Sequence, residues 1–168
     1  MGRKAVISRA TGETDIELIL ELDGQGLLEG STGIGFFDHM LHLLARHGGF
    51  NINLLKVAGD LEVDAHHTVE DLGICLGQAF AQAIGDKKGI KRYGSAWIPM
   101  DEALVLAVVD ISGRPYLGMQ VSLSKEKVGD FDTELVEEFW RAFTLHGGVT
   151  MHLKQETGHN THHIIEAI

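Results

Sequence analysis

The chain has 168 residues, of which 44% are hydrophobic and 23% are charged, and its formal net charge is −10. These proportions are typical of a globular protein with a sizeable core, and no apolar run reaches the ~18 residues that span a bilayer. The acidic balance argues against nucleic acid or a membrane surface as a partner, because both bind basic patches. A single cysteine, Cys75, and no evident signal peptide predict a cytoplasmic protein without internal disulfides.

Strand-like and helix-like segments alternate along the chain. In order, we expect two strands with a turn near Gly12 in residues 4–24, a helix in 34–49, a strand pair in 50–64, a long helix in 65–86, strands in 96–123, a helix in 132–148, a strand in 149–157 and a helix from 159. Both halves show the same succession. This predicts a two-layer α/β (α+β) fold of duplicated β-β-α-β-β-α half-domains, residues 1–90 and 91–168, packed as one pseudo-twofold unit.

The register of the chain supports this duplication. His47-Gly48-Gly49 and His146-Gly147-Gly148 stand 99 residues apart, and at that offset His39 falls on Glu138. Two His-His-x-x-Glu motifs, His66-His67-x-x-Glu70 and His162-His163-x-x-Glu166, stand 96 residues apart. A difference of three residues in the connection before the second motif accounts for the change of offset.

The doubled motif has the chemistry of a metal site. On a helix, residues three and four apart share a face, so both histidines of each motif neighbour its glutamate. Adjacent histidines point about 100° apart, so each pair is better placed to bridge two ions than to chelate one. Imidazole and carboxylate donors without thiolate favour Mn²⁺, Fe²⁺, Zn²⁺ or Ni²⁺, and six-coordination favours Mn²⁺. His39 and Glu138 are candidate additional ligands, whereas His42 and His47 fit packing or substrate contacts equally well.

Other interpretations fit parts of this pattern. Histidine pairs occur by chance on surface helices, although two copies in a matched repeat make chance a weak explanation. The motif is neither the HExxH nor the HxxEH of metalloproteases. A histidine-rich metal-binding or storage assembly needs only the ligands, and a dinuclear metallohydrolase would share them.

Six segments together resemble the imidazoleglycerol-phosphate dehydratase family: RATGETDIEL, GFFDHMLHLLARHGGF, DAHHTVEDLGICLGQA, RYGSAWIPMDEAL, DISGRPYL and GHNTHHIIEAI. The resemblance implies a hydro-lyase of histidine biosynthesis with a duplicated fold and two Mn²⁺ per active site. It also implies a homo-oligomer of 24 subunits with sites completed between neighbours. The implied metal ligands are His39, His66, His67, Glu70, Glu138, His162, His163 and Glu166.

The resemblance also implies a substrate site. Imidazole glycerol phosphate is expected to contact Glu13, His39, His42, His47, Arg92 and Arg114, and catalysis is expected to involve Glu13, His67 and His163. Glu13 is the first choice for the general base, with Asp101, Glu102 or a metal-bound water as alternatives. Arg92 and Arg114 are expected to bind the phosphate.

The family continues its last helix beyond the position at which this sequence stops, Ile168. That continuation contributes to substrate binding in the family. The resemblance therefore also leads us to expect a truncated chain that binds metal but has little or no activity. We expect it to assemble incompletely if the missing segment carries a contact between subunits.

Overall fold

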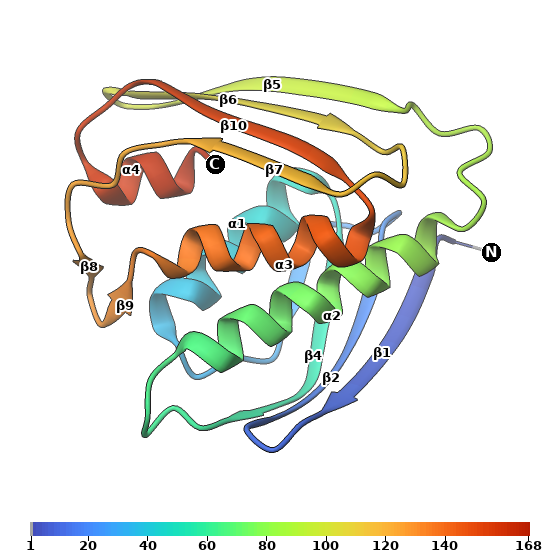
Figure 1. Ribbon diagram of the computed structural model, residues 1–168. Helices are drawn as coiled ribbons and strands as arrows, with labels where there is room; N and C mark the ends of the chain where they lie inside the picture. The colour runs from blue at the N-terminus through green and yellow to red at the C-terminus, as the bar shows by residue number, and fades with distance from the viewer. Residues whose placement is uncertain (1) are drawn as a thin grey trace.

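The computed structural model describes residues 2–168, which fold into two four-stranded sheets with helices between them (Figure 1). The second sheet lies at the top of Figure 1 and the first at the lower right, and α1, α2 and α3 fill the space between. None of the helices in residues 2–168 is long and apolar enough to span a bilayer.

The first sheet has the strand order β1-β2-β4-β3. Its half of the chain comprises β1 (Lys4–Ala10), β2 (Thr14–Glu21), β3 (Leu27–Glu29), α1 (Gly35–Gly48), β4 (Asn51–Gly59) and α2 (His66–Ile84). β2 is antiparallel to β1 and β4, whereas β3 is parallel to β4. Because side chains alternate along a strand, Ile16, Leu18 and Leu20 of β2 all point inward and are buried.

The second sheet repeats this arrangement with the order β5-β6-β10-β7. Its half comprises β5 (Tyr93–Met100), β6 (Ala103–Asp110), β7 (Tyr116–Gln120), the two-residue strands β8 (Lys127–Val128) and β9 (Phe131–Asp132), α3 (Leu135–Gly147), β10 (Thr150–Thr157) and α4 (Thr161–Glu166). Gly49 and Gly148, 99 residues apart, end α1 and α3 in the same left-handed conformation, with φ of 71° and 62°. The duplicated α+β fold is therefore confirmed.

The order of strands and helices within each half differs from the expectation. Residues 50–64 form one strand, β4, followed by a turn, so the strand pair expected there was wrong. A third strand instead precedes the first helix of each half. The sequence pattern did not predict β3, because this strand has only three residues. It is bounded by Gly26 and Gly30, which both have positive φ.

One hydrophobic core joins the two halves. Its buried residues come from β1, β2, β4, α1 and α2 of the first half and from β9, α3 and α4 of the second, and Cys75 lies among them. α2 packs along α3 at close range, and glycines make this possible. A Cβ on Gly73 would lie 2.7 Å from the carbonyl oxygen of Phe139, and one on Gly77 would lie 2.6 Å from that of Phe143. The expected division near residue 90 stays a prediction.

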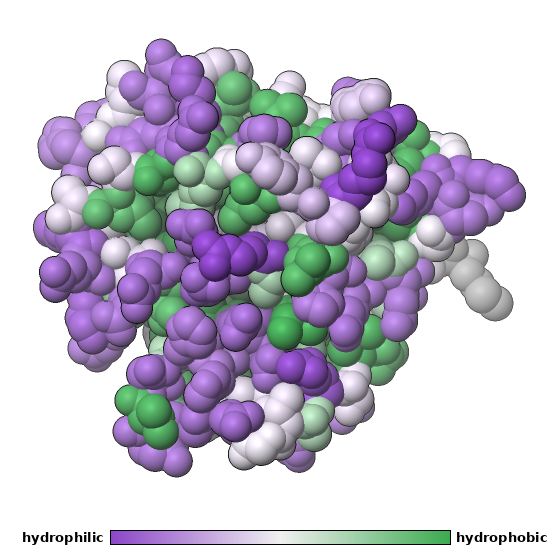
Figure 2. Space-filling model, viewed as in Figure 1, coloured by the Kyte–Doolittle hydropathy of each residue, from purple (hydrophilic) through white to green (hydrophobic). Residues whose placement is uncertain are grey.

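The second half is less completely covered by its own helix. α2 has 19 residues and packs against α3, β1 and β2, whereas its counterpart α4 has six. A mainly apolar cavity of about 630 Å³ lies between α1, α3 and the end of β5, with Ile98, Trp140 and Ile168 among its lining residues. Hydrophobic residues also interrupt the mostly hydrophilic surface on the face shown in Figure 2.

Candidate metal and substrate site

Both copies of the doubled motif begin a helix in the same way. The backbone N–H of His66 donates to Asp64 Oδ1 at 2.7 Å, and that of His162 donates to Asn160 Oδ1 at 3.0 Å. Each bond satisfies an N–H group that has no partner within the helix. A polar residue two positions ahead therefore fixes the start of each motif, and the duplication extends to this detail.

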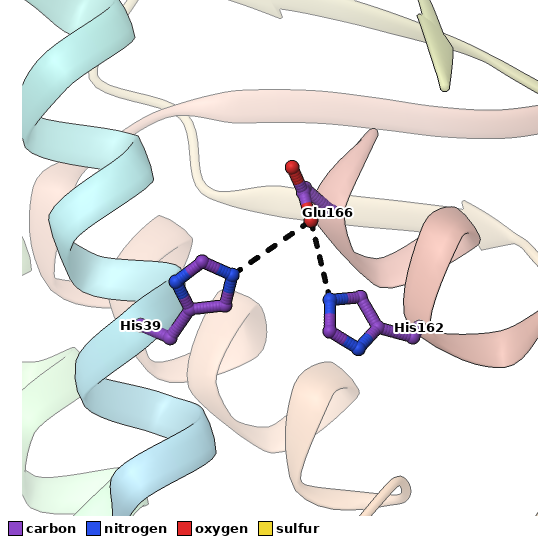
Figure 3. Close-up of side chains that lie close together, drawn as sticks. All are labelled: His39, His162 and Glu166. Carbon is purple, nitrogen blue, oxygen red and sulfur yellow. Dashed lines mark hydrogen bonds and ion pairs between the residues drawn. The ribbon is translucent and has the colours of Figure 1, made fainter. Parts of the chain in front are cut away.

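His39, His162 and Glu166 form the one group of potential metal ligands found within residues 2–168 (Figure 3). Glu166 Oε2 lies 3.2 Å from His162 Nε2 and 3.8 Å from His39 Nε2. Donor atoms that share an ion at roughly 2.1 Å lie about 3–4 Å apart, so this spacing fits a divalent ion. The ring of Phe36 meets that of His162 edge-on at 5.2 Å and restricts its orientation.

The corresponding residues around the first motif are His66, Glu70 and Glu138. They do not come together as one group. His66 Nε2 and Glu70 Oε2, both on α2, lie 3.7 Å apart. Glu138 on α3 instead accepts hydrogen bonds of 3.0 and 3.2 Å from Arg141, which also donates to Glu137 at 2.7 Å. The role of Glu138 as a metal ligand stays a prediction.

Arg141 was missed by the sequence analysis. Its spacing from Glu138 and Glu137, three and four residues, was the available signal. The hydrogen bond to Glu137, then the charge of Glu138, raises the pKa of Arg141, and the charge of Glu70 adds to this. Arg141 is thus a permanent cation paired with Glu137 and Glu138 and influenced by Glu70.

The second histidine of each motif turns away from the first. His67 Nδ1 lies 2.9 Å from Asp60 Oδ2, and His163 Nδ1 lies 2.7 Å from Glu102 Oε2. These hydrogen bonds are the main reason that the pKa of each histidine is raised. The rings of the two neighbours stand nearly perpendicular in the first motif, at 87°. The two histidines of each motif thus lie beside different carboxylates, and the bridging of two ions expected from their divergence stays a prediction.

The three carboxylates considered for the general base differ in their surroundings. Glu13 is exposed in the β1–β2 turn, and its side chain has no hydrogen-bond partner within residues 2–168. Its charge is close enough to His67 to contribute to the raised pKa of that histidine. The hydrogen bond from His163, then that from the backbone of Asn160, lowers the pKa of Glu102 to about 2. Asp101 is exposed and has a positive φ of 48°.

Arg92 and Arg114 meet at one carboxylate. Arg92 Nε donates to Asp110 Oδ1 at 2.6 Å, and a terminal guanidinium nitrogen of Arg114 lies 3.7 Å from Asp110 Oδ2. The hydrogen bond from Arg92, together with the charge of Arg114, lowers the pKa of Asp110. Both guanidinium groups are partly exposed and carry the charge and N–H donors that an anion requires, so the expected binding of phosphate there stays a prediction.

The remaining substrate candidates lie along α1. His42 and His47 are both exposed, and His47 borders the cavity between α1 and α3. Their expected contact with substrate stays a prediction.

Known proteins resemble this chain over nearly its whole length. The family model for imidazoleglycerol-phosphate dehydratase matches residues 32–168. An imidazoleglycerol-phosphate dehydratase of Acetivibrio thermocellus is 60% identical over 168 residues, which is 100% of this chain and 86% of the relative. That of Gluconobacter oxydans is 59% identical over 165 residues, 98% of this chain and 83% of the relative.

The solved structures agree with this result. The crystal structure of the Staphylococcus aureus imidazoleglycerol-phosphate dehydratase matches with a TM-score of 0.88 and 47% identity, covering 98% of this chain and 91% of that chain. A crystal structure of the Pyrococcus furiosus protein matches with a TM-score of 0.82 and 37% identity, covering 96% and 85%. The chain therefore belongs to the imidazoleglycerol-phosphate dehydratase family of hydro-lyases, the family that its motifs resemble.

Proposed function

We propose that this chain removes water from imidazole glycerol phosphate to give imidazole acetol phosphate in cytoplasmic histidine biosynthesis, with two Mn²⁺ ions in each active site. The observation that carries the proposal is the cluster of His39, His162 and Glu166. Its two nitrogens and one oxygen come from different halves of the chain and lie within 4.8 Å of one another. Such a set of nitrogen and carboxylate donors suits a six-coordinate divalent ion.

The chemical difficulty of the reaction is that the C–H bond to be broken lies beside no carbonyl group. Divalent ions held by the motif histidines and glutamates would supply the Lewis acidity that favours the imidazole anion. Electron density from that anion can expel the hydroxyl group on the carbon attached to the ring, after which the proton on the neighbouring carbon becomes acidic. Loss of that proton gives an enol, which rearranges to the ketone.

Glu13 is the proposed base for that proton. Its carboxylate is exposed and free of hydrogen-bond partners within residues 2–168, and it lies near His67. Glu102 is a weaker candidate because a carboxyl group with a pKa of about 2 is a poor proton acceptor at neutral pH. Asp101 stays an alternative.

The phosphate is proposed to bind between Arg92 and Arg114. These residues lie at one end of β5, whereas Glu102 and the contact with His163 lie at the other. A strand rises about 3.3 Å per residue, so the two ends are roughly 25–30 Å apart. One small substrate cannot reach both ends within a chain. We therefore propose a homo-oligomer in which neighbouring chains complete each site, with the 24 subunits expected from the resemblance as its size.

The experiment combines metal analysis with turnover. The purified chain is loaded with Mn²⁺, its bound metal and native mass are measured, and formation of imidazole acetol phosphate is followed. His162→Ala should lose both bound Mn²⁺ and turnover, whereas His152→Ala, an exposed histidine on β10, should retain both. Stoichiometric Mn²⁺ with no turnover by the unaltered chain would contradict the proposal. It would favour either the metal-binding chain of little or no activity expected from the resemblance or a metal-binding protein without catalysis.

Arg114→Ala tests the phosphate site separately. Its side chain is 77% exposed and its ion pair with Asp110 is long, so its loss should leave the fold and the bound Mn²⁺ unchanged. We expect KM for the substrate to rise at least tenfold, because a charged hydrogen bond to phosphate contributes about 1.5–3 kcal/mol. An unchanged KM would exclude Arg114 from the phosphate site.

A further inference from the structure

In both halves of the chain, a carboxylate fixes the ring of the second motif histidine. A carboxylate has no proton to give at neutral pH, so the Nδ1 atoms of His67 and His163 are the donors in their bonds to Asp60 and Glu102. A neutral imidazole has one N–H group and one lone pair. The lone pair of each ring is therefore placed on Nε2, the atom that remains for a metal ion.

The two acceptors occupy different places in the fold. Asp60 is the first residue after β4, whereas Glu102 immediately precedes β6. Glu102 is held by its other oxygen, Oε1, which accepts the backbone N–H groups of Asn160 at 2.7 Å and His159 at 3.2 Å. Asp60 Oδ1 is buried and has no partner within the described part of the chain. Each carboxylate thus directs its Oδ2 or Oε2 atom to the histidine.

The difference between the halves involves Glu13. Glu13 immediately precedes β2 as Glu102 immediately precedes β6, so the two glutamates hold corresponding positions. In the second half, that glutamate binds the histidine. In the first half, Asp60 takes over this task, and the carboxylate of Glu13 is left without a hydrogen bond from residues 2–168.

We infer that Asp60 and Glu102 are positioning residues that hold His67 and His163 in the Nδ1–H form with Nε2 available to a metal ion. This inference rests on the proposed function, because the benefit of a free Nε2 depends on a bound ion. Acceptors of this kind orient metal-binding histidines, and their loss weakens metal binding by about 10- to 100-fold. By supplying a separate acceptor for His67, Asp60 also leaves Glu13 free to act on the substrate.

Glu102→Gln is the decisive variant because its geometry is fixed. The two backbone N–H groups require an oxygen at the position of Oε1, so the amide NH₂ of glutamine must face His163 Nδ1. That NH₂ can only donate, which forces the proton of the ring onto Nε2 and removes the lone pair from the metal side. Glutamine matches glutamate in shape, so the fold should be retained, as circular dichroism would show.

The first measurement is the ring tautomer in the metal-free protein, by ¹⁵N NMR of histidine at a pH where the rings are neutral. We expect the Nδ1–H form for His67 and His163 in the unaltered chain. Glu102→Gln should convert His163 to the Nε2–H form and leave His67 unchanged. An Nε2–H form of His163 in the unaltered chain, or no change in the variant, would overturn the inference.

The second measurement is Mn²⁺ binding by titration calorimetry, with Mn²⁺ as the only ligand. We expect Glu102→Gln to raise the dissociation constant by about 10- to 100-fold, whereas Glu156→Gln, in an exposed ion pair with Lys154, should not change it. Equal affinities of Glu102→Gln and the unaltered chain would overturn the inference. If the unaltered chain bound no Mn²⁺, the proposed metal site would fail, and the tautomers alone would decide the role of Glu102.

Discussion

The close contact between α2 and α3 gives a quantitative prediction about stability. Gly73→Ala would place a methyl carbon 2.7 Å from the Phe139 carbonyl oxygen and 3.0 Å from the Ala142 Cβ. Both distances are shorter than van der Waals contact, and the first involves backbone that no rotamer change can move aside. The two helices would have to separate by about half an ångström, against the close packing of the core.

Two opposing effects set the size of the change. Alanine is favoured over glycine inside a helix by about 1 kcal/mol. Overpacking of a well-packed core costs about 1–3 kcal/mol, and a contact with backbone belongs at the upper end of that range. We therefore expect Gly73→Ala to lower the free energy of unfolding by about 1–2 kcal/mol.

Gly35→Ala is the matched control. Gly35 is the first residue of α1, and a Cβ there would meet nothing within 4 Å among the described residues. This substitution should be neutral or stabilise by up to about 1 kcal/mol. The assay is urea unfolding of the metal-free protein at a fixed protein concentration, followed by circular dichroism. With an m-value of roughly 2 kcal/mol/M, Gly73→Ala should lower the midpoint by about 0.5–1 M. A midpoint raised as much as in Gly35→Ala would refute the close-packing argument.

Substitutions at two other positions test local features of the fold. The pKa of Asp23 is lowered to about 2 by hydrogen bonds from Arg3, so the pair contributes stability above the ordinary pKa of 3.8 and loses it as the pH falls through 2. Asp23→Asn should therefore lower the melting temperature slightly at pH 7 and leave it unchanged near pH 2; a constant difference at all pH values would contradict the linkage. Asn160→Ala should destabilise α4 by about 1 kcal/mol, and Asn160→Asp should not, because Asp64 makes the same bond in the first motif. Equal melting temperatures of the alanine and aspartate variants would show that the bond is unimportant.

The fold could be predicted where local patterns are long and periodic. The spacing of apolar residues and the closing glycines placed α1 and α3, and alternation placed β1 and β2, because both features depend on neighbours in the sequence. β3 could not be found in this way. Three residues carry too little periodicity, and β3 exists because β4 offers a parallel partner that is distant in the sequence.

The site was predictable to the extent that the duplication constrained it. Internal register paired His39 with Glu138 and one motif with the other, and the structure brings His39 to His162 and Glu166. The partners of His67 and His163 could not be predicted. Asp60 and Glu102 lie 7 and 61 residues away from them in the sequence, and nothing in the motif marks them. Their selection depends on how β4 and the β5–β6 turn meet the helix starts, which is a property of the assembled fold.

The duplicated site carries different residues in its two half-sites, and their charges explain how this is possible. One half-site consists of His39, His162 and Glu166, and the other of Glu138, His66 and Glu70. The cluster of His39, His162 and Glu166 has one carboxylate and two neutral imidazoles when the histidines are neutral. In the counterpart, Glu138 stands at the position that His39 holds in this cluster and adds a negative charge, and the charges of both Glu138 and Glu70 act on Arg141. The residue three positions further along the helix also changes, from His42 on α1 to Arg141 on α3. Arg141 adds one positive charge, so both half-sites carry a net charge of −1. The substitutions at the two positions thus compensate each other, and a divalent ion bound as proposed would meet the same local charge in either half.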